Sequence, residues 1–257
     1  MIWEVIGLGG YKSILGEVRS GKLSIKEAER MLRVDNLKKI EEFARIDTGR
    51  ESRAGVPEVI LAEGKTPEQV VKIAGGIKGH GALISRVGDE HLRALRKRFG
   101  RLEYNKFAKT VAIAGGKTPQ TKGVVGVITA GTFDIRVAEE AAVVAEMMGC
   151  KVKKAYDVGV AGIHRLFTPL KKMVADGADV IVVVAGREGT LPSIVAGMVD
   201  VPVIGVPTSS GYGFGGKGEA ALKSMLQSCS FITVVNIDNG IGAGACAALI
   251  ARRVNEN

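Results

Sequence analysis

From Gly123 to the C-terminus, short continuous apolar runs alternate with longer helical patterns, and this alternation limits the possible folds more than any other feature. The apolar runs are VVGVITAG, KVKKAYDVG, DVIVVVAG, VPVIGVP and FITVVNI. Strands that are apolar on both faces, with helices between them, are typical of a parallel sheet covered by helices on both sides. The sequence therefore predicts a three-layer α/β domain over residues 123–257.

The preceding part of the chain has a less regular pattern. Ser24 and Glu27 have the spacing of a capping box, and Thr66 followed by proline indicates a second helix start. We expect further helical pattern in LKKIEEFARID and DEHLRALRKRF, and strands in PEVILA and GALISRV. These segments predict a small, basic α+β domain over residues 1–114, joined through a linker at residues 115–122.

Composition limits the classes of function. No apolar run approaches the roughly 20 residues that cross a bilayer, and no export signal opens the chain, so we expect a cytoplasmic protein without a membrane contact. Three cysteines without close spacing favour neither disulfides nor a zinc site. Residues 1–119 hold 23 Lys and Arg against 15 Asp and Glu, whereas the remainder holds 13 against 12. Because aromatic residues are only 5% and the basic residues are mixed with acids, nucleic acid is not the expected partner.

Ligands of parallel α/β sheets bind beyond the carboxyl ends of the strands, which selects four polar or Gly-rich loops. These loops are TAGTFD, GVAGIHR, AGREGTLPS and PTSSGYGFGGKG. In the first, Thr132 or Asp134 caps the next helix, whose free N–H groups also suit a phosphate or carboxylate. The last satisfies the G-x-x-x-x-G-K part of a nucleotide-triphosphate loop, but Gly218 stands where Ser or Thr must bind magnesium. An NTPase is therefore not expected.

Several reactive residues have both a structural and a functional interpretation. Cys229, at the junction of a helix and a strand, is by itself typical of a small buried apolar residue, as are Cys150 and Cys246. His164 follows a strand-end loop and is either structural or part of a ligand site. Glu188 is either a helix-capping surface acid or a ligand for a metal or a water molecule.

Taken in order, the four loops resemble those of the aminoimidazole ribonucleotide carboxylase and mutase family of the purine pathway. Residues 131–134 are similar to its Gly-Ser-x-Ser-Asp phosphate loop, residues 163–165 to its Ala-His-Arg loop, and VPVIGVP to one of its strands. Thr132 replaces the first serine and Ile163 replaces the alanine. The resemblance implies a flavodoxin-like core and a homo-oligomer, with an octamer as the family's assembly.

Nearly the whole chain resembles the LarB family, the carboxylases of nickel-pincer cofactor biosynthesis. The matching segments are RAGVPEVILAEGKTPEQV, VITAGTFDIRVAEEA, YDVGVAGIHRL, VVVAGREGTLPSIVAG, PVIGVPTSSGYGFGG and MLQSCSFITVVNIDNG. This resemblance implies that nicotinic acid adenine dinucleotide and CO₂ or bicarbonate are the substrates. The pyridinium ring is carboxylated at C5 and the phosphoanhydride is hydrolysed, giving pyridinium-3,5-biscarboxylic acid mononucleotide and AMP.

The chemistry of the pyridinium ring explains why a thiol is needed. Aminoimidazole can attack CO₂ unaided, whereas a cationic pyridinium cannot. A thiolate that adds to C4 makes C5 enamine-like; after C5 attacks CO₂ and loses its proton, expulsion of the thiolate restores aromaticity. With the motif match, Cys229 is the predicted nucleophile. His164 or Asp134 is the predicted base for the C5 proton.

The other predicted roles concern the substrate and a metal. We expect Glu188 to hold Mg²⁺ or to orient the water that cleaves the anhydride. The residues expected to contact the carboxylate, ribose or phosphates of the substrate are Gly131, Thr132, Arg165, Gly186, Thr208, Ser209, Ser210, Gly211, Gly213 and Gly216.

Two other functions remain open. A purine-pathway carboxylase or mutase would need no cysteine, so replacement of Cys229 would spare it. A non-catalytic nucleotide-binding or nucleic-acid-binding protein would retain ligand without product, with binding that depends steeply on salt. The sequence does not assign a role to the basic N-terminal domain.

Overall fold

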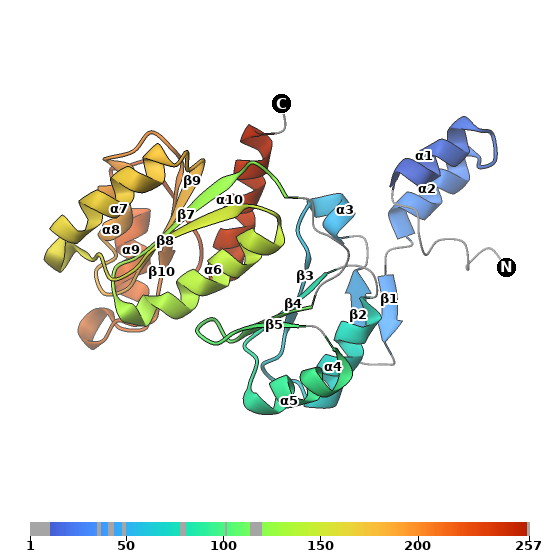
Figure 1. The fold of residues 1–257 in the computed structure, drawn as a ribbon, viewed down its shortest axis with the longest axis horizontal. Helices are drawn as coiled ribbons and strands as arrows, with labels where there is room; N and C mark the ends of the chain where they lie inside the picture. Colours follow the sequence, from blue (N-terminus) through green and yellow to red (C-terminus); the bar gives the residue numbers. More distant parts are fainter. Residues whose placement is uncertain are drawn as a thin grey trace.

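The computed structural model describes residues 11–34, 37–40, 44–47, 50–77, 81–100, 102–113 and 120–255. Its C-terminal part contains a five-stranded parallel sheet in the order β11-β10-β9-β7-β8 (Figure 1). The strands are β7 (Val124–Thr129), β8 (Lys151–Ala155), β9 (Val180–Ala185), β10 (Val203–Pro207) and β11 (Ile232–Val234). In chain order this is 2-1-3-4-5, the flavodoxin-like arrangement. The predicted fold class is confirmed.

Helices cover both faces of this sheet because its strands are apolar on both faces. All six residues of β9 are buried. One core cluster contains Val180, Val182 and Val184, and the other contains Ile181, Val183 and Ala185. The first cluster lies under α6 (Ile135–Met147) and α10 (Gly240–Val254). The second lies under α7 (His164–Ala175), α8 (Leu191–Ala196) and α9 (Glu219–Leu226).

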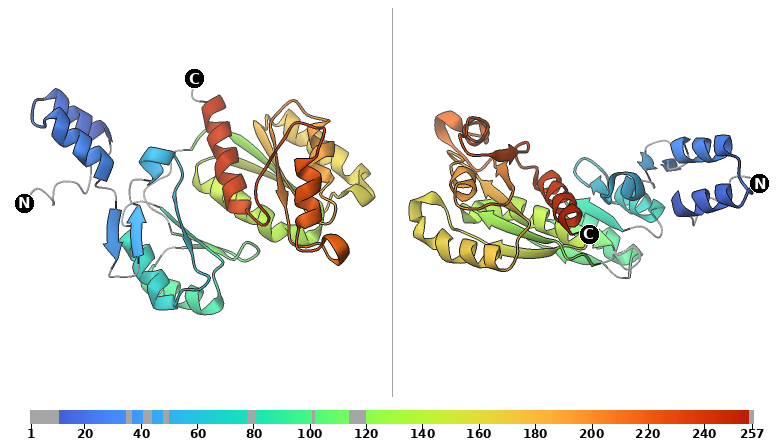
Figure 2. Two further views of the ribbon diagram at one scale, coloured as in Figure 1. Left: turned by 180° about the vertical axis from the view of Figure 1, so that it is seen from behind. Right: turned by 90° about the horizontal axis from the view of Figure 1, so that it is seen from above.

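A smaller mixed sheet, in the order β3-β4-β6-β5, forms the centre of the N-terminal part (Figures 1 and 2). Its strands are β3 (Glu58–Leu61), β4 (Ala82–Ser85), β5 (Glu103–Asn105) and β6 (Thr110–Ile113). Alternation along β4 gives the sheet two apolar faces. Ile84 packs in a cluster with α4 (Pro67–Gly76) and α5 (Asp89–Arg98), whereas Leu83 joins the cluster under α6 and α10. The two parts of the chain therefore share a core.

A polar contact also joins the two parts. Asn105 Nδ2, at the end of β5, donates a hydrogen bond to Glu139 Oε2 of α6 at 2.5 Å. Asn105 Oδ1 meanwhile accepts hydrogen bonds from the backbone N–H groups of Phe107 and Ala108, both at 3.0 Å, in the β5–β6 turn. The turn is therefore fixed against the helix that starts at the first predicted ligand loop.

The structure confirms both predicted helix starts in the N-terminal part. Before α2 (Ile25–Val34), the Glu27 N–H donates to Ser24 Oγ at 3.2 Å, and the Ser24 N–H donates to Glu27 Oε2 at 3.1 Å. Thr66 and Gln69 make the corresponding pair of bonds at the start of α4. Reciprocal bonds of this kind satisfy N–H groups that have no partner within the helix.

The predicted helix in LKKIEEFARID is wrong. Its described residues form an antiparallel pair, β1 (Leu37–Ile40) with β2 (Ala44–Asp47). Ile40 and Ile46 pack so closely against α4 that a Cβ at Gly76 would come within 2.7 Å of both side chains. This contact with a distant helix outweighs the local helical pattern.

Three further elements were not predicted from the sequence: α1 (Tyr11–Arg19), α3 (Arg50–Ala54) and the β5–β6 hairpin. Helices α1 and α2 lie side by side and stand apart from the remainder (Figures 1 and 2). The predicted linker, residues 115–122, falls largely outside the described residues, so the domain boundaries stay a prediction. Within the described residues, no helix combines the length and the apolar character that spanning a bilayer requires.

Candidate active site

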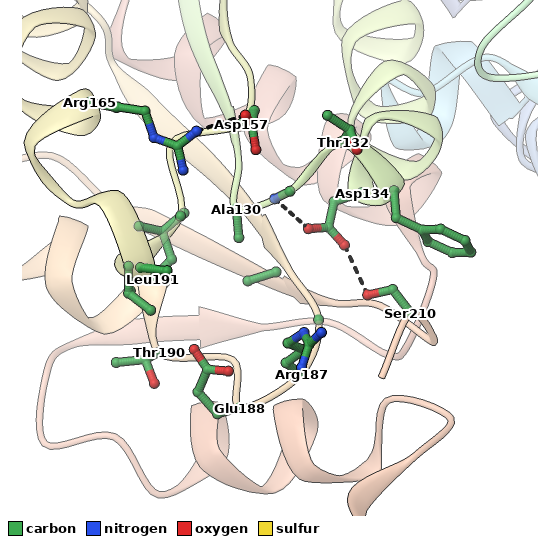
Figure 3. Close-up of a pocket in the computed structure, with 17 residues that line it drawn as sticks. Ala130, Thr132, Asp134, Asp157, Arg165, Arg187, Glu188, Thr190, Leu191 and Ser210 are labelled. Atoms are coloured by element: carbon green, nitrogen blue, oxygen red, sulfur yellow. Dashed lines mark hydrogen bonds and ion pairs between the residues drawn. The ribbon is translucent and has the colours of Figure 1, made fainter. Parts of the chain in front are cut away.

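A pocket of about 600 Å³ lies at the carboxyl ends of the parallel strands (Figure 3). It occupies the point where the strand order reverses, between β7 and its neighbours β8 and β9, which is the usual ligand site of this architecture. Its lining comes from the loops after β7, β8, β9 and β10, as the sequence predicted. The residues that line it are Ala130, Gly131, Thr132, Phe133, Asp134, Asp157, Gly159, Val160, Ala161, Arg165, Ala185, Gly186, Arg187, Glu188, Thr190, Leu191 and Ser210.

Asp134 is a buried carboxylate in this pocket. Its Oδ1 accepts hydrogen bonds from Thr208 Oγ1 at 2.6 Å and Ser210 Oγ at 3.2 Å, and its Oδ2 accepts one from the Gly131 N–H at 2.9 Å. Burial raises the pKa of the carboxyl above its ordinary value, although these hydrogen bonds oppose the shift. A buried, partly compensated carboxyl suits proton transfer.

A second charged group comes from the β8–α7 loop. Arg165 Nη1 lies 2.7 Å from Asp157 Oδ2, and the Asp157 N–H donates to Thr129 Oγ1 at 3.0 Å. Asp157 adopts the left-handed backbone conformation, with φ of 58°. The bond to Thr129 at the end of β7 therefore fixes the loop, and the guanidinium of Arg165 is held beside the pocket.

The β9–α8 loop supplies Arg187 and Glu188. Arg187 Nη2 donates to the Tyr212 hydroxyl at 2.9 Å, and its guanidinium carbon lies 4.6 Å from the centre of that ring. Glu188 is exposed and makes no hydrogen bond or ion pair with any described residue. The loop thus presents one fixed cation and one free carboxylate to the same pocket.

Gly186 allows this loop to approach the strand beside it. A Cβ there would overlap Ser210 Oγ and would lie 2.7 Å from Thr208 Oγ1, the two hydroxyls that hold Asp134. The position therefore has a steric reason to be glycine, because any side chain would displace the partners of the buried carboxylate.

The structure brings together many, but not all, of the predicted site residues. Those that line the pocket are Gly131, Thr132, Asp134, Arg165, Gly186, Glu188 and Ser210. Thr208 lies behind the lining, where it bonds to Asp134, and Ser209 points to Asp238. Four other predicted residues lie outside the lining: His164, which is exposed at the start of α7, and Gly211, Gly213 and Gly216.

Cys229 does not line the pocket of its own chain. It is exposed in the turn between α9 and β11, so it lies at the amino end of a strand, whereas the pocket lies at the carboxyl ends. The five residues of neighbouring β10 separate these two edges by roughly 15 Å. The turn is anchored to α8, because Ser230 Oγ donates to the Ser193 carbonyl at 3.0 Å. Cys150 is buried and Cys246 is half-buried.

The described residues contain no group of three or more His, Cys, Asp or Glu side chains placed to hold a metal ion. Glu188 is the pocket carboxylate without a protein partner among the described residues. Mg²⁺ commonly binds one or two carboxylates and completes its shell with water and substrate phosphates. The site therefore fits Mg²⁺ that arrives with a phosphate-containing ligand.

Several lining residues were not predicted from the sequence, among them Asp157 and Arg187. Asp157 lies in the segment KVKKAYDVG, which was predicted as a strand, whereas Arg187 lies in a loop that the strand-end rule selected. Their left-handed backbones, with φ of 58° and 49°, had no signal in the sequence because neither residue is glycine.

Fold and site together define a class: a flavodoxin-like α/β protein whose switch-point pocket combines arginines with carboxylates. Comparison with known proteins identifies the family. Residues 124–257 match the AIR carboxylase family, and residues 37–115 match the LarB/PurE-like N-terminal domain. The chain belongs to the AIR carboxylase family, in the form that carries a LarB/PurE-like N-terminal domain.

Individual relatives agree with this assignment. "Uncharacterized protein MJ0165" of Methanocaldococcus jannaschii is 43% identical over 250 residues, which cover 94% of this chain and 96% of the relative. An N5-carboxyaminoimidazole ribonucleotide mutase of Pyrococcus horikoshii is 34% identical, over 52% of this chain and 72% of the relative. The mutase of Thermotoga maritima is 32% identical, over 51% and 81%. The mutases therefore resemble only about half of this chain.

Proposed function

We propose that this protein carboxylates nicotinic acid adenine dinucleotide at pyridinium C5 and hydrolyses its phosphoanhydride. The products are pyridinium-3,5-biscarboxylic acid mononucleotide and AMP, for nickel-pincer cofactor biosynthesis in the cytoplasm. The observation that carries the proposal is that one chain joins a LarB/PurE-like N-terminal domain to an AIR carboxylase domain whose strand-end pocket is lined by Arg165 and Arg187. A pocket of about 600 Å³ is within the range that small-molecule ligands occupy.

The charged groups of the pocket suggest how the substrate is held. Arg165 and Arg187 are cations fixed by Asp157 and Tyr212, and they suit the carboxylate or phosphates of the dinucleotide. Glu188 with Mg²⁺ would neutralise charge at the phosphoanhydride and orient the attacking water. Asp134, whose pKa is raised by burial, is the better placed base for the C5 proton, because His164 lies outside the pocket.

Ring carboxylation requires a nucleophile that makes C5 electron-rich. The Cys229 thiolate adds to C4, which gives a neutral dihydropyridine. C5 then attacks CO₂, the base takes the C5 proton, and the C4–S bond breaks to restore the pyridinium and the thiolate. Of the three thiols, Cys229 is exposed, whereas Cys150 is buried and Cys246 is half-buried, so Cys229 is the most accessible to a substrate.

The position of Cys229 adds a requirement to this proposal. Since it lies at the opposite edge of the sheet from its own pocket, the thiol serves the pocket of another copy in a homo-oligomer. The exposed side chains of Leu226 and Phe231 flank it, and exposed apolar residues of this size favour a protein contact. The subunit number, including the octamer that the family resemblance implies, is part of the proposal.

Product analysis tests the proposal. The purified protein is incubated with nicotinic acid adenine dinucleotide, Mg²⁺ and ¹³C-bicarbonate, and the products are identified by mass spectrometry. We expect AMP and a mononucleotide with one labelled carboxylate; Cys229→Ala gives no carboxylated product, whereas the control Cys246→Ala retains it. Recovery of unchanged dinucleotide would rule out this substrate.

The similarity to mutases favours a second candidate, a purine-pathway carboxylase or mutase. Its aminoimidazole substrate needs no covalent activation. If aminoimidazole ribonucleotide or its carboxylated form is converted, and Cys229→Ala leaves the rate unchanged, this second function replaces the first.

A further inference from the structure

A second pocket, of about 380 Å³, lies between the N-terminal part and the C-terminal domain. The N-terminal part contributes Glu63 from the β3–α4 loop, Arg86 from the β4–α5 loop and Lys109 from the β5–β6 turn. The C-terminal domain contributes Arg136 of α6 and Asp238 of the β11–α10 loop. Three cations and two carboxylates thus meet in a cavity that neither part forms alone.

Two of these cations are fixed by carboxylates. Arg86 Nη1 bonds to Glu63 Oε2. Arg136 Nη1 bonds to buried Glu140 Oε1 at 3.0 Å, and its Nη2 lies 3.7 Å from Asp238 Oδ2. A guanidinium has five N–H donors, so each arginine keeps donors for a ligand while its side chain is already ordered.

Lys109 differs from the arginines, because it makes no ion pair with any residue that the structure describes. It lies in the turn that Asn105 fixes to α6, and its carbonyl accepts the Val87 N–H at 2.8 Å, which joins the turn to the loop that carries Arg86. The free ammonium therefore belongs to a structured part of the pocket and gives it an excess of positive charge.

The backbone at this pocket has an unusual conformation. Arg86, Lys109 and Asp238 have φ of 53°, 50° and 57°, and they are three of the six non-glycine residues with positive φ in the described chain. Such conformations are unfavourable for residues with a side chain, and they gather at ligand sites. Asp157 and Arg187 of the strand-end pocket belong to the same set of six.

The two pockets are neighbours. Asp238 Oδ1 accepts the Ser209 N–H at 3.0 Å, and its Oδ2 accepts Ser209 Oγ at 2.6 Å. The next residue, Ser210, lines the strand-end pocket and bonds to Asp134. The adjacent residues Ser209 and Ser210 therefore connect the two pockets: Ser209 bonds to Asp238 of the interdomain pocket, and Ser210 bonds to Asp134 of the proposed catalytic pocket.

We propose that the interdomain pocket binds the phosphate group of a nucleotide, with Lys109, Arg86 and Arg136 as its cationic ligands. Arginine and lysine are the usual ligands of phosphates, and the cavity is larger than a phosphate alone requires. The choice of a nucleotide rests on the proposed function, whereas the anion site rests on the pocket itself. This gives the basic N-terminal part a binding role.

Photolabelling tests the location. The full chain is irradiated with 8-azido-AMP, digested and mapped by mass spectrometry. We expect label on peptides that cover residues 86–88 or 102–113. We expect about tenfold less label in Lys109→Gln, since this variant loses a charged hydrogen-bond donor to the phosphate. Lys106→Gln is the matched control, because Lys106 is exposed in the same turn but does not line the pocket. Label confined to the strand-end loops, or equal label in Lys109→Gln, would overturn the proposal.

Kinetics distinguish the two sources of the phosphate. If it belongs to the adenylate half of the dinucleotide, Lys109→Gln raises KM about tenfold at unchanged kcat, which corresponds to a loss of about 1.4 kcal/mol. If the phosphate belongs to a free mononucleotide, Lys109→Gln leaves the KM for the dinucleotide unchanged and lowers only the labelling. Failure of the proposed function would instead appear as wild-type protein that labels at the hairpin but does not carboxylate the dinucleotide.

Discussion

Replacing Glu140 by glutamine should stabilise the protein above neutral pH. The Glu140 side chain is only 4% exposed, and burial raises its pKa from 4.5 to about 7 in spite of nearby Arg136 and Arg86. Folding therefore takes up a proton between these two pKa values. As pH rises through this window, the carboxyl of the unfolded chain ionises in water, whereas burial disfavours its ionisation in the folded protein. The free energy of unfolding therefore falls.

The size of the effect follows from the difference between the two pKa values. At 1.36 kcal/mol per pKa unit, the ionised carboxylate costs about 3 kcal/mol at pH 8 and under about 1 kcal/mol at pH 5. Glutamine stays neutral and keeps an acceptor for Arg136. The stability of Glu140→Gln relative to wild type should therefore rise by roughly 2 to 3 kcal/mol between pH 5 and pH 8.

Urea unfolding followed by circular dichroism at pH 5, 6, 7 and 8 measures this difference. Comparing variant with wild type at each pH cancels the titration of all other groups. Glu146→Gln is the control, because Glu146 is exposed on the same helix and pairs with Lys154 at the surface. A stability difference for Glu140→Gln that does not change with pH would refute the reasoning.

Three further predictions concern the strand-end pocket. Gly186→Ala should lower carboxylation at least about tenfold, since its Cβ would displace Ser210 from Asp134, whereas Gly75→Ala, with no atom within 4 Å of the new Cβ, should not. Asp134→Asn should lower kcat about 100-fold without preventing binding of the dinucleotide, as expected for loss of a general base. An unchanged kcat would show that Asp134 is not the base. Glu188→Gln should raise the Mg²⁺ concentration for half-maximal AMP release about tenfold, and EDTA should stop AMP release by the wild type. If the variant and the wild type need the same Mg²⁺ concentration, Glu188 is not a ligand.

The parts of the fold that the sequence predicted are those whose patterns are local. Every residue of β7 and β9 is buried, and all but Gly126 and Thr129 are apolar, so the pattern of these strands alone indicates a covered parallel sheet. The pair β1–β2 was predicted as a helix because the contact of Ile40 and Ile46 with α4 is not visible in the segment itself. The β5–β6 hairpin was not predicted for the same reason, because the hydrogen bond between Asn105 and Glu139 of α6 is a contact with a distant segment.

The site was predictable as a set of loops but not as a set of contacts. The strand-end rule selected the loops that carry Asp134 and Ser210, yet their hydrogen bond joins residues 76 positions apart. The position of Cys229 outside its own pocket depends on which edge of the sheet its turn occupies. The interdomain pocket was not predicted, because Arg86 and Arg136 come from different domains and meet only after folding.

The central claim is that the pocket of one copy acts together with Cys229 of another. Two variants, Cys229→Ala and Asp134→Asn, are co-expressed with different affinity tags, and complexes that hold both are purified. If the two groups act across copies, mixed complexes recover about a quarter of wild-type carboxylation in a large oligomer and about half in a dimer, while each variant alone stays at about 1% or below. If mixed complexes are as inactive as the separate variants, although the wild type carboxylates the dinucleotide, the claim is contradicted.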